Sequence, residues 1–372
     1  MGTLYDYLSW RGDLSFSESG PNEVDCLIFS MISYLDYDGI VSSSHDESGI
    51  TLRHAAAKLQ ARFPDPKKMV TGVLIPKDIG PLLRKLKDTR RFRGVELKAF
   101  VNEIDEQAEK QFSAITFLLD NGMAVVTYRG TDDTLIGWKE DMNMCYLPVV
   151  PSQEAAVEYL RQAATAHSGP LIVTGHSKGG NLAVYAAVKC RKAIRKRIKS
   201  VYSNEGPGFG RSLLDDPVYQ EMRPLIHNLV PQATVVGILL EHDDHLTVVK
   251  SRQTGLLQHN GLSWEVMGNS FVHLKKTAPE SRRADKTINQ WIKAMTPEQR
   301  AEFSASVYQL FSVEGVKTLT DLVAVKKKWL SHSKTLDPKV HETVQTMMAD
   351  LVKRNSKNLL TDIFRKGDGE NK

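Results

Sequence analysis

The 372-residue chain carries 49 Lys and Arg against 44 Asp and Glu, a formal net charge of +5, and 41% of its residues are hydrophobic. This hydrophobic content is enough for a sizeable folded core. No stretch has the uninterrupted apolar length of a bilayer-spanning helix, and no basic region followed by an apolar run opens the chain, so we expect a soluble, cytoplasmic protein.

The basic excess lies near the C-terminus, where residues 276–372 hold 18 Lys and Arg against 12 Asp and Glu. Acidic lipid is a conceivable partner for such a region, so peripheral membrane contact is one expectation, although solvated helix faces explain the charge more simply. A second run of cations spans residues 189–199, where it complements the C-terminal end of a helix dipole. We therefore expect no nucleic-acid partner.

Residues 1–90 are expected to form an N-terminal arm and helices that pack on the core. Apolar side chains recur at nearly helical spacing in residues 22–37, and residues 51–62 predict a further helix that ends at the turn Pro64-Asp65-Pro66. Residues 81–86 predict a shorter one.

From Gly94 the pattern predicts β-strands. Asp120-Asn121-Gly122 lies between two apolar, β-rich runs and is a strong hairpin signal. The second run ends in Tyr128-Arg129-Gly130-Thr131, and residues 152–165 then predict a helix that leads to the next strand.

Residues 171–190 read LIVTGHSKGGNLAVYAAVKC. A short apolar run predicts a buried strand, the Ala- and Leu-rich segment predicts a buried helix, and Gly175-His176-Ser177-Lys178-Gly179 joins them. This arrangement of strand, GxSxG and helix is the nucleophile elbow of α/β-hydrolases, in which a strained turn exposes the serine. The sequence therefore predicts an α/β fold of this class, with a mostly parallel sheet flanked by helices.

Further strand candidates follow at residues 198–203, 234–240 and 246–249, and the sheet is expected to end near residue 266. We expect residues 91–276 to form the hydrolase core. From residue 277 the chain is helical in character, with helix starts at Thr296-Pro297-Glu298-Gln299 and at Asp337-Pro338. Residues 277–372 are predicted to be a C-terminal helical extension or lid.

A serine nucleophile needs a histidine base, and in this fold the chain order is serine, acid, histidine. His259 follows the last apolar run and precedes a tryptophan, so it is the preferred base, with His227, His242, His245 and His273 as competitors. For the acid, chain order favours the cluster Glu241, Asp243 and Asp244, while Glu205 at the end of an earlier strand stays close behind. The residues alone leave this choice open.

An oxyanion hole needs backbone N–H groups near the serine. The residue after the nucleophile, Lys178, is one expected donor, and the Gly130-Thr131 turn is the other. The cysteines, Cys26, Cys145 and Cys190, are far apart in apolar surroundings and are expected to be reduced core residues. No metal is expected from the His242 to His245 spacing, and no organic cofactor, because neither GxGxxG nor a Walker A loop is present.

The sequence resembles the class 3 lipases, and more closely an uncharacterised bacterial branch of lipase-like proteins. The similar stretches are TYRGTDD with Trp138 and Asp141, TGHSKGG, VYSNEGPGFG, and LVP followed by QHNGLSWEV, and the N-terminal DYLSWRGDLSF and NEVD also match that branch. The resemblance implies Ser177 as nucleophile, His259 as base, and Thr131 with Lys178 as contributors to the oxyanion hole.

The sequence departs from the lipases at two positions. Lys178 stands where these lipases commonly have leucine, which predicts a cation beside the nucleophile and a preference for an acidic or phosphate-bearing substrate. Asn228 stands at the usual acid position, so the acid has moved to Glu205 or to residues 241–244, or the triad is weakened. We therefore predict a serine hydrolase that cleaves a carboxylic ester or thioester of a lipid-like substrate through an acyl-enzyme on Ser177. The alternative is a non-catalytic lipid-binding or scaffold protein that retains the hydrolase fold.

Overall fold

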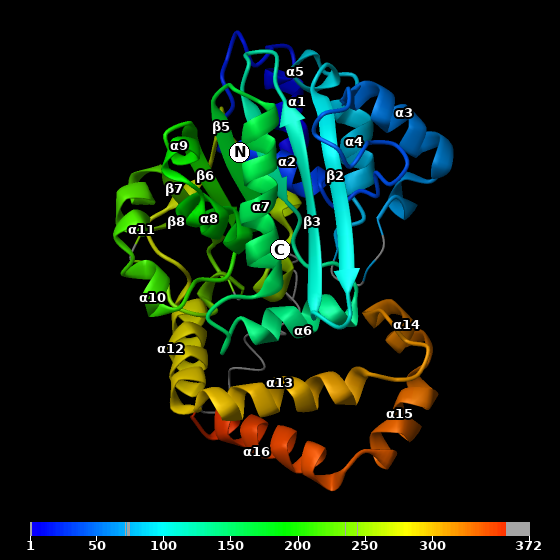
Figure 1. Ribbon diagram of the computed structural model, residues 1–372, viewed down its shortest axis with the longest axis vertical. Helices are drawn as coiled ribbons and strands as arrows, with labels where there is room; N and C mark the ends of the chain where they lie inside the picture. The colour runs from blue at the N-terminus through cyan, green and yellow to red at the C-terminus, as the bar shows by residue number, and fades with distance from the viewer. Residues whose placement is uncertain (1, 71, 73–74, 235, 244, 355–372) are drawn as a thin grey trace, which may run out of the picture.

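A nine-stranded sheet forms the centre of the protein, seen in a computed structural model that describes all residues except 1, 71, 73–74, 235, 244 and 355–372 (Figure 1). The strand order across the sheet is β1-β2-β3-β4-β5-β6-β7-β8-β11. The strands are β1 Ile50–Thr51, β2 Glu96–Asp105, β3 Lys110–Leu118, β4 Ala124–Tyr128, β5 Leu171–His176, β6 Ile198–Asn204, β7 Ile226–Pro231, β8 Leu246–Val249 and β11 His273–Leu274. A separate hairpin pairs β9 Val266–Met267 with β10 Ser270–Phe271.

The middle of the sheet, from β4 to β8, is parallel, and the strands at both margins pair antiparallel. The predicted hairpin between β3 and β4 is present, with Gly122 at a φ of +76°. Because the carboxyl ends of β4, β5, β6 and β7 meet at one edge, loops after these strands are brought together there. The predicted fold class, a mixed α/β sheet flanked by helices, is confirmed.

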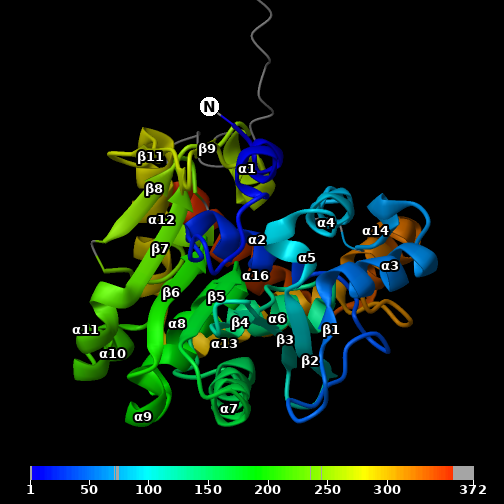
Figure 2. The same cartoon turned by 90° about the horizontal axis from the view of Figure 1, so that it is seen from above.

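Helices cover both faces of the sheet, as Figure 2 shows with α1 and α2 on one side and α7 and α8 on the other. Alternate strand residues serve the two layers: Val125 and Ile172 pack with the N-terminal helices, whereas Val126 and Val173 pack with α7 and α8. The N-terminal layer comprises α1 Leu4–Arg11, α2 Glu23–Ile32, α3 Leu52–Arg62, α4 Ile79–Leu86 and α5 Arg90–Arg93. The opposite layer comprises α7 Pro151–Ala166, α8 Lys178–Lys189, α9 Lys192–Arg195, α10 Arg211–Leu214 and α11 Pro217–Met222.

The remaining helices lie beyond the carboxyl edge of the parallel strands (Figure 1). They are α6 Leu135–Asn143, α12 Pro279–Ala294, α13 Pro297–Phe311, α14 Leu319–Ala324, α15 Lys326–Thr335 and α16 Pro338–Arg354. Thr296 and Gln299 form the predicted capping box of α13. Leu135 N–H donates to the Lys317 carbonyl and Leu319 N–H to the Asp133 carbonyl, both at 2.9 Å, so the extension is bonded to the loop that follows β4.

One strand prediction was wrong. The strand that follows β6 is β7, Ile226–Pro231, whereas the segment assigned to residues 234–240 contains the short 3₁₀ helix Val236–Ile238. No helix in the described part of the chain has both the length and the apolarity needed to cross a membrane.

Candidate active site

Ser177 stands between β5 and α8 in a strained backbone conformation, with φ of +57° and ψ of −134°. Such a φ is uncommon for a residue that is not glycine. The flanking glycines permit the turn, because a Cβ on Gly175 would lie 2.1 Å from the Gly179 carbonyl oxygen, and one on Gly179 would lie 2.1 Å from that of Tyr128. The GxSxG motif therefore folds locally as the sequence predicts.

His259 ends the short 3₁₀ helix Gly255–His259 and is paired with Glu205. Its Nδ1 lies 2.9 Å from Oε2 of Glu205, whose side chain is 1% exposed, while that of His259 is 20% exposed. The other carboxylate oxygen accepts a hydrogen bond from the Thr234 hydroxyl at 2.5 Å. Glu205 follows β6 directly and has a φ of +52°, and its N–H donates to the carbonyl of Leu229 on β7 at 2.7 Å.

His176, the residue before Ser177, connects the elbow to the loop of His259. Its Nε2–H donates to the His259 carbonyl at 2.8 Å, and the two imidazole rings lie 4.5 Å apart between centroids. Burial, together with the nearby His259, lowers the pKa of His176 to about 3, so the ring is neutral near pH 7. A neutral ring has one acceptor nitrogen, and Nδ1 accepts from the Tyr34 hydroxyl at 3.1 Å.

Tyr34 brings the N-terminal region into the site, which the sequence did not indicate. Its hydroxyl also accepts a hydrogen bond from the Gly130 backbone N–H. A Cβ on Gly130 would lie 2.1 Å from this hydroxyl and 3.0 Å from Cβ of Ser177, so the Gly130-Thr131 turn sits against the serine. The Thr131 hydroxyl donates to Oδ2 of Asp141 at 2.6 Å, which holds the turn on α6.

The side chain of Lys178 is buried, so the structure does not show the expected cation exposed beside the nucleophile. Its side chain is 1% exposed, and Nζ lies 3.0 Å from Oε2 of Glu140 and 2.6 Å from Oε1 of Gln111. Glu140 also accepts the backbone N–H groups of Gln111 at 3.0 Å and Ser152 at 2.8 Å. The Glu140 carboxylate thus balances the positive charge of Lys178 inside the protein, and this ion pair anchors the elbow to α6.

The acidic cluster lies elsewhere. Oδ2 of Asp243 lies 3.1 Å from the Tyr219 hydroxyl and 3.3 Å from Nε of Arg223. Glu241 pairs with Arg211 and Lys293 at 2.5 Å and 3.1 Å. Asp244 falls outside the described residues. Glu205, and not Glu241 or Asp243, is thus the carboxylate that pairs with His259.

Two of the competing histidines, His227 and His273, have partners of their own. His227 stacks on Tyr202 with ring centroids 4.7 Å apart, and Nε2 of His273 lies 2.9 Å from Glu23. Asn228 lies on β7 and hydrogen-bonds the Tyr219 side chain. Cys26, Cys145 and Cys190 are free thiols, and within the described ranges no three His, Cys, Asp or Glu residues are grouped as a metal site.

A family model described as Mbeg1-like matches residues 86–309, more than half of the chain. The chain belongs to the Mbeg1-like family. The match covers the elbow, the Gly130-Thr131 turn, Glu205 and His259, and it ends within α13. Among curated proteins no sequence matches.

Several solved structures are similar to this Mbeg1-like chain at low identity. The Rhizomucor miehei lipase propeptide complex is 16% identical, with 53% of this chain and 66% of that one covered and a TM-score of 0.32. The M37 lipase is 15% identical, with 91% and 96% covered and a TM-score of 0.36. The lipase from Rhizopus microsporus var. chinensis is 14% identical, with 70% and 84% covered and a TM-score of 0.34. The chain thus spans slightly less than two thirds of the first of these, and all three are lipases by name.

Proposed function

We propose that this protein is a serine hydrolase that cleaves a carboxylic ester or thioester of an acyl lipid through an acyl-enzyme on Ser177. The observation that carries the proposal is the pair of His259 with the buried carboxylate of Glu205, which His176 links to the strained strand-to-helix turn of Ser177. These are the parts that a triad requires, in the chain order serine, acid, histidine.

In the proposed reaction Oγ of Ser177 attacks the acyl carbonyl carbon and Nε2 of His259 takes the hydroxyl proton. Glu205 accepts the Nδ1–H bond, which fixes the tautomer and stabilises the imidazolium. Collapse of the tetrahedral intermediate breaks the bond to the alcohol or thiol, which receives the proton from His259. Water, deprotonated by His259, then attacks the acyl-enzyme and releases the carboxylic acid and Ser177.

The negative oxygen of the intermediate would accept hydrogen bonds from the backbone N–H groups of Lys178 and Thr131. Support for this role comes from the short approach of Gly130 to Cβ of Ser177 and from the bond between the Thr131 hydroxyl and Asp141. The Lys178 ammonium is buried against Glu140, so no preference for an acidic substrate is proposed from it.

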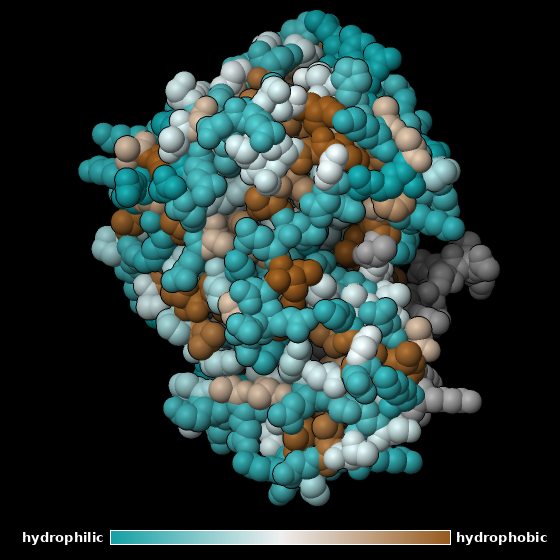
Figure 3. Space-filling model, turned by 45° about the vertical axis from the view of Figure 1, so that its right-hand side comes forward, coloured by the Kyte–Doolittle hydropathy of each residue, from teal (hydrophilic) through white to brown (hydrophobic). Residues whose placement is uncertain are grey.

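The alternative, a non-catalytic lipid-binding or scaffold protein, rests on the amide of Asn228 at the usual position of the triad acid. Glu205 weakens this argument, because its carboxylate already lies at Nδ1 of His259. Peripheral membrane contact is a weaker proposal than hydrolysis, because it would be favoured by a continuous apolar surface. The face in Figure 3 is mostly hydrophilic, with apolar residues in separate clusters.

The test is labelling of the intact protein with a fluorescent fluorophosphonate, followed by ester and thioester turnover assays. We expect wild type to label, Ser177→Ala to be unlabelled, and His259→Ala and Glu205→Gln to label far more slowly. Asp243→Asn is the matched control, since it alters a carboxylate that pairs with Arg223 instead. Folded wild type that fails to label would favour the binding-protein alternative.

A further inference from the structure

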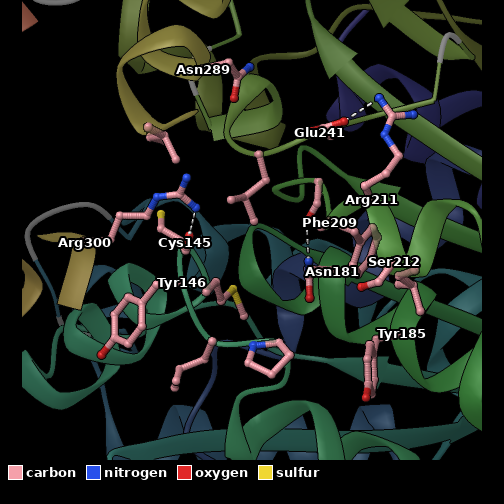
Figure 4. A pocket seen from close by; sticks show the side chains of 18 of the residues that line it. Cys145, Tyr146, Asn181, Tyr185, Phe209, Arg211, Ser212, Glu241, Asn289 and Arg300 are labelled. Atoms are coloured by element: carbon pink, nitrogen blue, oxygen red, sulfur yellow. Dashed lines mark hydrogen bonds and ion pairs between the residues drawn. The ribbon is translucent and has the colours of Figure 1, made fainter. Parts of the chain in front are cut away.

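A cavity of about 330 Å³ lies between the core and the C-terminal helices (Figure 4). The core side includes residues 144–148 after α6 and residues 208–213 after β6, and the other side comes from α12 and α13. The residues that line it include Asn181, one turn of α8 beyond Ser177, but not Ser177, Thr131 or His259. The proposed catalytic residues therefore do not line this cavity.

The charged residues that line this cavity are positive in excess: three cations, Arg211, Lys293 and Arg300, accompany one carboxylate, Glu241. Arg211 and Lys293 share that carboxylate at 2.5 Å and 3.1 Å. Guanidinium and ammonium groups have five and three N–H donors, so one shared carboxylate does not use them all. The excess of positive charge favours an anionic ligand group.

Arg300 adds a buried donor on the side of the C-terminal helices. Its Nη1 donates to the Cys145 carbonyl at 2.9 Å, and its Nε is buried with no hydrogen-bond partner among the described residues. A buried donor without a partner costs stability, so a ligand acceptor in this position would be favourable. In Figure 4, Arg300 and Arg211 stand on opposite sides of the cavity, with Phe209 and Asn181 between them.

The rest of the lining contains a large apolar share, from Met144, Leu147, Pro148, Phe209, Leu213, Leu240 and Ile292. Ligand pockets have volumes of about 300–1,000 Å³, so this cavity suits a small ligand with one short chain. Apolar and cationic residues together in the lining favour an amphiphilic ligand. Since the core and the C-terminal helices both contribute lining residues, a bound ligand contacts both.

We propose that this cavity binds a single-chain amphiphile with an anionic head, an alkyl phosphate or an alkanoate, and that the ligand holds α12 and α13 against the core. The head lies against Arg211 and Lys293, which share Glu241, and the chain lies against Phe209 and Ile292. The proposal does not rest on the hydrolase function, because none of the catalytic groups lines the cavity.

Calorimetric titration of the full-length Ser177→Ala variant tests the ligand chemistry without turnover. The probes are octyl phosphate and octanoate, with octanol, octyltrimethylammonium and inorganic phosphate as comparisons. We expect either or both anionic amphiphiles to bind at least about tenfold more tightly than each comparison probe, as loss of one charge-assisted hydrogen bond implies. Equal binding of octanol, equal binding of inorganic phosphate, or no binding of either anionic amphiphile would overturn the proposal.

Variants and hydrogen exchange locate the site. Lys293→Gln and Arg211→Gln remove cations whose side chains are 60% and 65% exposed, so neither change threatens folding. Each is expected to weaken binding about tenfold, while Lys286→Gln, an exposed cation on α12 outside the lining, leaves it unchanged. The anionic amphiphile that binds should also slow amide exchange in α12 and α13. Binding that is insensitive to both lining variants, or that leaves this exchange unchanged, would contradict the assignment.

Discussion

Nδ1 of His259 lies 2.9 Å from Oε2 of Glu205, a carboxylate that the protein buries almost completely. The pair joins residues 54 positions apart, one after β6 and one in the 3₁₀ helix that leads toward β9. Because the Thr234 hydroxyl holds the second oxygen of Glu205, the carboxylate has a defined orientation toward the imidazole. This pair identifies Glu205 as the candidate acid of the proposed triad.

Glu205→Gln is expected to slow fluorophosphonate labelling and ester turnover by about 10³–10⁴-fold, since an amide at this position no longer favours the reactive tautomer of the base. Initial labelling rates and kcat/KM measure the effect. Asp243→Asn, the control, should stay within about twofold of wild type, as expected for a change away from the reacting groups. Comparable losses in the two variants would contradict the assignment of Glu205.

Asp141 should make the stability of the protein depend on pH. Burial raises its pKa to about 6 from the ordinary 3.8, although Lys178 and the Thr131 hydroxyl oppose the shift. The native protein thus holds this proton more tightly than the unfolded chain, so the contribution of Asp141 to stability is present at about pH 4 and is lost as the pH rises through about 6.

The Asp141→Asn variant lacks this titration. Relative to wild type, its free energy of unfolding should therefore rise by about 2 kcal/mol between about pH 4 and pH 7. Urea denaturation of both proteins across this range measures the difference. A difference that does not change with pH would show that Asp141 titrates normally in the native state.

Lys178→Met should destabilise the protein by about 3–5 kcal/mol, because it leaves the carboxylate of Glu140 buried without its cation. Adding Glu140→Gln should recover part of this loss, as an uncharged amide is easier to bury. Lys139→Met on α6, the helix of Glu140, is the control. Lys139 and Glu109 are 18% and 35% exposed, so their ion pair is expected to contribute at most about 1 kcal/mol to stability. Denaturant unfolding of the four proteins tests the coupling, and a double variant as unstable as Lys178→Met would refute it.

Tyr34→Phe removes a hydroxyl that bonds both His176 and Gly130. We expect a loss of about 1–3 kcal/mol of stability together with slower labelling, because the loop of His259 and the Gly130-Thr131 turn both depend on this oxygen. Tyr37→Phe is matched to it, because Tyr37 is also buried but its hydroxyl donates elsewhere, to the Ile32 carbonyl at 3.1 Å. Labelling should fall only in Tyr34→Phe, and a parallel fall in both variants would indicate a general effect of stability.

Much of the architecture could be predicted from the sequence, because local signals determine it. The hairpin at Gly122, the GxSxG elbow at Ser177 and the capping box at Thr296 each depend on residues within a few positions of one another. His259 could also be predicted as the histidine near the elbow, since chain order in this fold restricts the candidates. These features follow from spacing and from backbone requirements, which a sequence displays directly.

The tertiary structure decided which acid meets His259, where the Lys178 ammonium points, and that Tyr34 takes part. The order of strands in the sheet places Glu205 at the base, and the packing of α6 on the elbow supplies Glu140 as the partner of Lys178. Tyr34 and His176 are 142 positions apart in the chain. Contacts of this kind depend on how distant elements pack, so no local pattern in the sequence records them.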